Sequence, residues 1–209
     1  MYTRMVRTAR VTGALAAVIW LVGTPVVAIA GVPFPSDAEY LLMGLVATLL
    51  GLTLTPVVLA IGEPMPSRKR AAVRLSGLVV CIALILSGVV LLAAVQGWLD
   101  EGLAHESPSV AITAFIALFV WIGFASYASR GPTTVERWTF RLGLISGAGC
   151  LVPVLIGIVM FYFVKDFVFI NATVLPILLF DLLVWASLPA WLTAVVFGMS
   201  PEHQLANPE

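Results

Sequence analysis

The chain has 209 residues, of which 61% are hydrophobic and only 11% are charged. A soluble domain of this length needs more charge to keep its surface hydrated. The formal net charge is zero, which disfavours nucleic acid as a partner because nucleic-acid interfaces are usually basic. The composition therefore predicts an integral membrane protein.

Long apolar blocks separated by short polar breaks run through the whole chain. A helix rises about 1.5 Å per residue, so about 20 apolar residues cross a hydrocarbon core of about 30 Å. Membrane β-barrels instead alternate in polarity along segments of about ten residues, and the block from Leu78 to Val95 does not alternate. We therefore predict an all-α polytopic helix bundle that forms a single membrane domain over residues 1–209. The expected transmembrane helices, about six in number, cover residues 11–31, 38–62, 71–96, 108–129, 142–164 and 172–198.

Polar residues mark where several of these helices should begin. Ser36 and Glu39 have the spacing of a capping box ahead of the second span. Ser107–Pro108 combines a capping residue with a proline, and we expect the fourth span to begin there. The fifth span should have an amphipathic lead-in from Thr133.

The basic residues predict the orientation of the chain. Positively charged loops stay on the cytoplasmic side of a membrane. With six spans, only Lys165 lies on the outer side, and the other ten basic residues share the opposite side: Arg4, Arg7, Arg10, Arg68, Lys69, Arg70, Arg74, Arg130, Arg137 and Arg141. We therefore expect a cell-membrane protein with both termini in the cytoplasm.

The first span has a second interpretation. Its arginines, its apolar run and the stretch Ala28–Ala30 resemble a secretory signal with a cleavage site. Cleavage would leave five spans and an outer amino terminus. Against this, about twenty apolar residues is long for a signal core.

Asp181 is the only acidic or basic side chain deep inside a predicted span. It should lie roughly 13 Å from the outer start of the last span, near the middle of the bilayer. Burying an ionised carboxylate there costs several kcal/mol, so Asp181 should be neutral, paired or in contact with water. Two hypotheses follow: a proton or cation site in a translocation pathway, or a neutral carboxyl that bonds to a neighbouring helix.

Proline and glycine residues predict irregular and closely packed positions in the spans. Each intramembrane proline removes one backbone hydrogen bond and can kink its helix. The candidate positions are Pro25, Pro56, Pro153, Pro176 and Pro189. Gly143 and Gly147 are four residues apart, a spacing that lets two helix backbones approach closely. We expect them to pack inside the bundle, with a dimer interface as the alternative.

Residues needed for common cofactors and catalytic sites are missing from the spans. The two histidines are His105, expected in an outer loop, and His203 in the carboxyl-terminal tail, so intramembrane histidine ligation of haem or metal is excluded. Gly-x-Ser-x-Gly and His-Glu-x-x-His motifs are missing as well. We predict no cofactor, no metal site and no enzymatic activity.

The sequence favours two functions over an enzyme acting on lipid. The first is a small transporter or channel component with a protonatable intramembrane carboxyl, based on Asp181 and the intramembrane prolines. The second is a structural or accessory subunit of a larger membrane complex, based on the short loops. The expected partners are bilayer lipid and either further copies of this chain or other membrane subunits. No substrate class is indicated.

Overall fold

The computed structural model describes residues 2–30, 36–61, 67–129, 134–152, 155, 182 and 184–196. These residues form helices joined by turns and contain no strand. The helices are α1 (Tyr2–Ala30), α2 (Asp37–Ile61), α3 (Ser67–Val95), α4 (Glu101–Ala128) and α5 (Thr134–Gly149). A shorter apolar helix, here called the last helix, covers Val184–Val196.

Four of the described helices, α1 to α4, are long and apolar enough to cross a membrane. With 25 to 29 residues each, they are about 38–44 Å long, more than a hydrocarbon core of about 30 Å requires. They correspond to the first four predicted spans. Much of the fifth and sixth predicted spans lies outside the described residues, so the total of six remains a prediction.

The predicted helix start at Ser107–Pro108 was wrong. Helix α4 begins at Glu101, and Asp100 is its N-cap, with a side chain that accepts a hydrogen bond of 2.8 Å from the amide of Leu103. Ser107 is therefore a buried residue inside the helix and not a cap. His105, expected in a loop, is likewise helical.

The helix continues through Pro108 because another group replaces the hydrogen bond that this residue cannot make. Proline has no amide hydrogen to donate to the carbonyl four residues earlier, here that of Ala104. The hydroxyl of Ser107 donates to this carbonyl at 2.8 Å. Ser107 thus satisfies a backbone group that lipid would leave unpaired.

Helices α1 and α3 also begin earlier than predicted. Helix α1 begins at Tyr2 and not near Val11, and α3 begins at Ser67 and not near Ala71. Both additions carry basic residues that were expected in a tail or a loop. A helix that is longer than the hydrocarbon is thick can place such charges at the polar boundary without ending.

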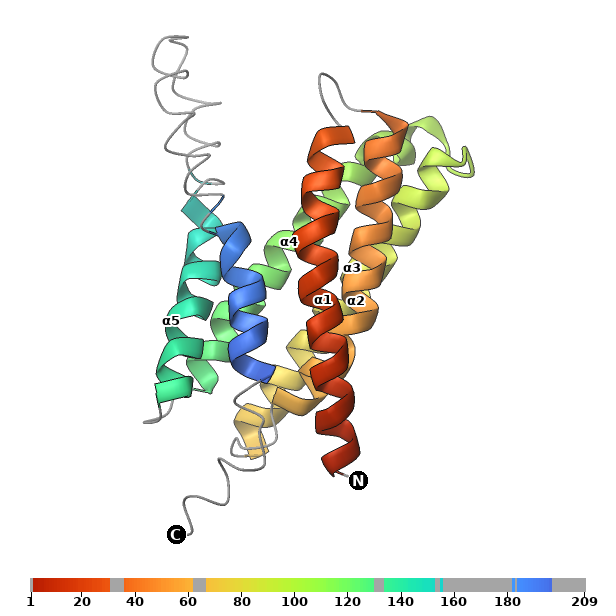
Figure 1. Cartoon of the computed structure of the whole chain (residues 1–209). Coiled ribbons are helices and arrows are strands. Elements are labelled where there is room, and N and C mark those ends of the chain that lie inside the picture. The colour runs from red at the N-terminus through yellow and green to blue at the C-terminus, as the bar shows by residue number, and fades with distance from the viewer. Residues whose placement is uncertain are drawn as a thin grey trace, which may run out of the picture.

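Consecutive helices pack side by side and alternate in direction (Figure 1). Helices α1, α3 and α5 therefore begin at the same end of the bundle (Figure 1). Every basic residue that the structure describes lies in the first three turns of one of these helices. The charge separation expected from the sequence is thus present in the described fold, while the side that faces the cytoplasm remains a prediction.

The last helix lies between α5 and α1 and crosses in front of α4 in the view of Figure 1. It contacts all three: Trp185 bonds to α1, Trp191 packs on α4, and Ser187 bonds to α5. We call this set of contacts the closing interface, because it joins the last helix to α1, α4 and α5.

The surface of the bundle is apolar, as a protein surrounded by lipid requires. Large hydrophobic side chains are exposed along each long helix, including Val22, Leu52, Leu75 and Ile112. The interior holds fully buried Leu, Val, Ile and Trp side chains in one cluster. Helices that are apolar on all sides are typical of membrane bundles.

Candidate functional site

The structure describes only some of the residues that the sequence singled out. Asp181, Pro153 and Pro176 lie outside the described residues. Pro25 and Pro56 lie within α1 and α2. Pro189 is a buried residue of the last helix.

Gly143 and Gly147 both lie on α5 and face α4. A Cβ atom on Gly147 would be 2.7 Å from the Cα atom of Gly123 and 3.0 Å from the carbonyl oxygen of Phe119. Gly143 packs against Ser126 in the same way, and a Cβ there would be 3.2 Å from the carbonyl oxygen of Ile122. The pair is therefore part of a contact inside the bundle, where only glycine lets the two backbones come this close.

Two tryptophans join α1 to the last helix through a closed ring of hydrogen bonds. The indole N–H of Trp20 donates to the carbonyl oxygen of Trp185 at 2.8 Å. The indole N–H of Trp185 donates in turn to the hydroxyl of Thr24. Thr24 donates to the carbonyl oxygen of Trp20 at 2.6 Å, which completes the ring. Each of the three side-chain donors in the ring is thus satisfied.

Pro189 explains why the Trp185 carbonyl can take part in this ring. In a regular helix that carbonyl accepts the amide hydrogen of the residue four positions later. That residue is Pro189, which has no amide hydrogen. The carbonyl is consequently free to accept a hydrogen bond from the Trp20 indole N–H. The hydrogen bond missing within the last helix is thus replaced by one between two helices.

A second polar contact joins the last helix to α5. The hydroxyl oxygens of Ser146 and Ser187 are 2.6 Å apart, and both residues are buried. Ser187 also donates to the carbonyl oxygen of Val184 at 2.6 Å. Since the Ser187 proton is used in this way, Ser146 is the donor in the pair.

A third contact joins the last helix to α4 and extends to α3. The indole N–H of Trp191 donates to the hydroxyl of Ser126 at 2.6 Å. The Trp191 ring meets that of Trp121 edge to face, with centroids 6.0 Å apart. Trp121 bonds in turn to the carbonyl oxygen of Val73 on α3 at 3.0 Å. Three helices, the last helix, α4 and α3, are thus linked through two indole rings and one serine.

The closing interface is neutral throughout. Its polar groups are hydroxyls, indoles and backbone carbonyls, which can exchange or orient hydrogen bonds but supply no charged ligand. Across the described parts of the chain, no group of three or more His, Cys, Asp and Glu side chains is placed to hold a metal ion.

The Thr-Pro pairs of α1 and α2 share one local arrangement. Thr24 donates to the carbonyl four residues earlier, and Thr55 does the same to Gly51 at 2.8 Å. Both helices continue beyond Pro25 and Pro56. The prolines at these two positions therefore do not end the helices.

Sequence reasoning missed the residues of the closing interface. A usable signal was present: Trp20, Trp121, Trp185 and Trp191 fall well inside apolar blocks and not at their ends. A tryptophan at that depth needs a partner for its N–H, because lipid offers none.

Comparison of the chain with protein-family models, with curated proteins and with solved structures finds no match.

Proposed function

We propose that this membrane protein is a small transporter or channel component, with Asp181 as its proton-binding or cation-binding carboxyl. The observation that carries the proposal is the hydroxyl-lined and indole-lined closing interface, which belongs to the chain segment that follows Asp181. Asp181 precedes the buried residues Val184 and Leu188 by three and seven positions. We infer an inward position for Asp181 from this spacing alone, because positions three and seven residues apart share one face of an α-helix.

The proposed chemistry is binding and release of one cation or proton. A carboxyl in a low-dielectric region gains or loses its proton only when a path to water opens. Movement of the last helix relative to α1, α4 and α5 would open such a path. The bond from Trp20 to the Trp185 carbonyl could then break without breaking a hydrogen bond inside the last helix, because Pro189 donates none to that carbonyl. The protein holds no ATP-binding motif, so the energy would come from an ion gradient or a partner.

The test is ion flux in proteoliposomes loaded with a pH-sensitive dye. Asp181→Asn should lower proton or cation flux by about tenfold or more, because an amide of the same shape carries no exchangeable charge. Asp37→Asn is the matched control, since Asp37 is an exposed residue in the first turn of α2. Equal flux for wild type and Asp181→Asn across a broad pH range would remove this carboxyl from the mechanism.

A structural or accessory subunit is the second candidate, favoured by the close glycine contacts of α4 with α5. Such a protein acts through helix packing alone and keeps a stoichiometric partner in mild detergent. Purification from its native membrane separates the two proposals: a monodisperse species of this chain alone, with flux activity, supports the transporter. A fixed complex with other subunits, and no flux without them, supports the accessory role.

A further inference from the structure

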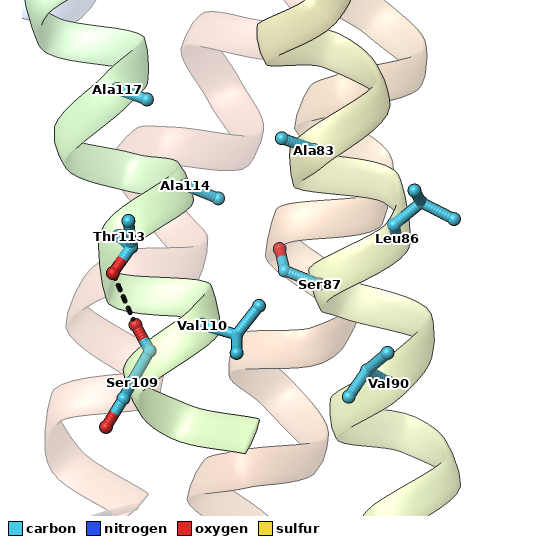
Figure 2. A pocket seen from close by; sticks show the side chains of 9 residues that line it. All are labelled: Ala83, Leu86, Ser87, Val90, Ser109, Val110, Thr113, Ala114 and Ala117. Carbon is cyan, nitrogen blue, oxygen red and sulfur yellow. Dashed lines mark hydrogen bonds between the residues drawn. The ribbon is translucent and has the colours of Figure 1, made fainter. Parts of the chain in front are cut away.

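A lateral groove lies between α3 and α4 (Figure 2), and no residue of the closing interface lines it. Its volume is about 480 Å³, which falls within the range of ligand pockets, about 300–1,000 Å³. Leu86 and Val110, on its two walls, are 58% and 49% exposed, so the groove opens on the outer face of the bundle. Its lining consists of Ala83, Leu86, Ser87, Val90, Ser109, Val110, Thr113, Ala114 and Ala117.

The groove exists because small side chains face one another across this part of the helix pair. Figure 2 shows Ala83 and Ser87 on α3 opposite Ala114 and Ala117 on α4. Further along the same pair, the Trp121 ring fills the space over Gly77, where a Cβ would be 2.7 Å from the ring. No comparably large side chain lines the groove.

The walls of the groove are mainly apolar, and two of their three hydroxyl groups are bonded within their own helices. Ser87 donates to the carbonyl oxygen of Leu84 at 3.0 Å, and Thr113 donates to that of Ser109 at 2.8 Å (Figure 2). Both protons are therefore used within their own helices. A hydrocarbon chain fits such a surface better than a polar solute does.

One end of the groove points to the start of α4, which is acidic. Glu106 precedes Val110 and Thr113 by four and seven residues, so it lies on the same helix face, about one turn beyond the groove. Glu106 is exposed, and so are Asp100 and Glu101 at the beginning of this helix. The apolar groove thus has a negatively charged rim.

We propose that the groove binds one acyl chain of an amine-bearing membrane lipid, phosphatidylethanolamine, with its ammonium group against Glu106. The hydrocarbon chain fills the space left by the alanines, and the carboxylate pairs with the headgroup where α4 leaves the bilayer. The primary ammonium can donate hydrogen bonds to the Glu106 carboxylate, which the quaternary ammonium of phosphatidylcholine cannot do. An anionic headgroup such as phosphatidylglycerol is repelled by this rim. The proposal does not depend on transport.

Binding of the acyl chain is tested by cross-linking in nanodiscs with a phosphatidylethanolamine that carries a photoactivatable group on its acyl chain. Labelled peptides should map to residues 83–90 of α3 and 109–117 of α4. Ala117→Phe places a large side chain in the groove and should reduce this labelling by about tenfold. Ala14→Phe adds the same side chain at an exposed position of α1, outside the groove, and should leave the labelling unchanged. Equal labelling of all exposed apolar helix faces in wild type would overturn the proposal.

The headgroup is tested by competition in the same nanodiscs. Unlabelled phosphatidylethanolamine should compete several-fold better than phosphatidylcholine or phosphatidylglycerol, and Glu106→Gln should abolish that preference while the groove is still labelled. Asp37→Asn, which removes an exposed charge from α2, should keep the preference. Equal competition by all three lipids against the wild-type protein would show that Glu106 selects no amine and would overturn the assignment of the lipid.

Discussion

A tryptophan buried in a membrane bundle carries one donor, its indole N–H, that lipid cannot satisfy. In the closing interface every such donor has an acceptor on another helix, and one of these acceptors is the carbonyl that Pro189 leaves unbonded. At this scale the protein uses a backbone defect as a specific attachment point.

Trp20→Phe should destabilise the folded protein by about 1 kcal/mol, in the range of hydrogen bonds measured between membrane helices. The substitution removes the N–H that bonds to Trp185 but keeps an aromatic ring beside Phe115 and Phe119. Reversible unfolding in mixed micelles of detergent and SDS measures the loss. Trp98→Phe is the control, because Trp98 is 79% exposed; equal losses for both variants would contradict the role of the bond.

The contribution of Pro189 is measured by a double-mutant cycle with Trp20→Phe. In Pro189→Ala the new amide hydrogen bonds to the Trp185 carbonyl, so removing the Trp20 indole should then cost less. We expect a coupling energy of about 0.5–1 kcal/mol. Additive effects of the two substitutions would show that the freed carbonyl does not contribute to the bond.

Among the described helices, four prolines lie inside a helix without ending it: Pro25, Pro56, Pro108 and Pro189. Pro108 was expected in the first turn of its helix, yet α4 begins seven residues earlier, at Glu101. Ser107 makes this possible by bonding to the carbonyl that proline leaves unpaired. A serine followed by a proline can cap a helix start, or it can lie inside a helix where the serine bonds to the carbonyl that proline leaves unpaired. The sequence is the same in both cases, and only the backbone conformation shows which one occurs.

Gly147→Ala should destabilise the contact between α4 and α5 by about 1–3 kcal/mol, a typical cost of overpacking. The added Cβ would meet backbone atoms of Gly123 and Phe119, which cannot rotate away as a side chain can. The same unfolding assay detects the loss.

Gly102→Ala is the control for this prediction. A Cβ on Gly102 would meet only the Asp100 carboxylate oxygen, at 3.5 Å. Alanine also favours the helix by up to about 1 kcal/mol over glycine, so this variant should be neutral or more stable. An unchanged free energy of unfolding in Gly147→Ala would show that α4 and α5 can move apart at this position without loss of stability, and would contradict the prediction.

At the scale of the whole molecule, the testable property is orientation. Single cysteines introduced at Lys69 and Glu101 lie at the starts of α3 and α4, hence at opposite ends of the bundle, and both positions are exposed. The native Cys81 and Cys150 are buried. We expect a membrane-impermeant maleimide to label Glu101→Cys on intact cells and Lys69→Cys only after lysis, following the positive-inside rule. The reverse pattern would invert the topology.

The helical class and the first four spans were predictable from the sequence, and so were the start of α2 and the ends of α3 and α4, to within one residue. The starts of α1, α3 and α4 were not. A block of about 20 apolar residues in lipid must satisfy its own backbone, which leaves helix as the favoured state whatever its neighbours are. These three starts are harder to predict because charged residues, such as those near Arg68, continue a helix beyond the hydrocarbon instead of stopping it.

The closing interface and the α3–α4 groove were decided by tertiary structure alone. Trp20 and Trp185 are 165 positions apart in the chain, and no local pattern links them. In water, an apolar stripe shows which side of a helix faces inward, but a membrane helix is apolar on every side. Its inward face is therefore chosen by where small residues, hydroxyls and freed carbonyls meet their counterparts on other helices, and that depends on the packed bundle.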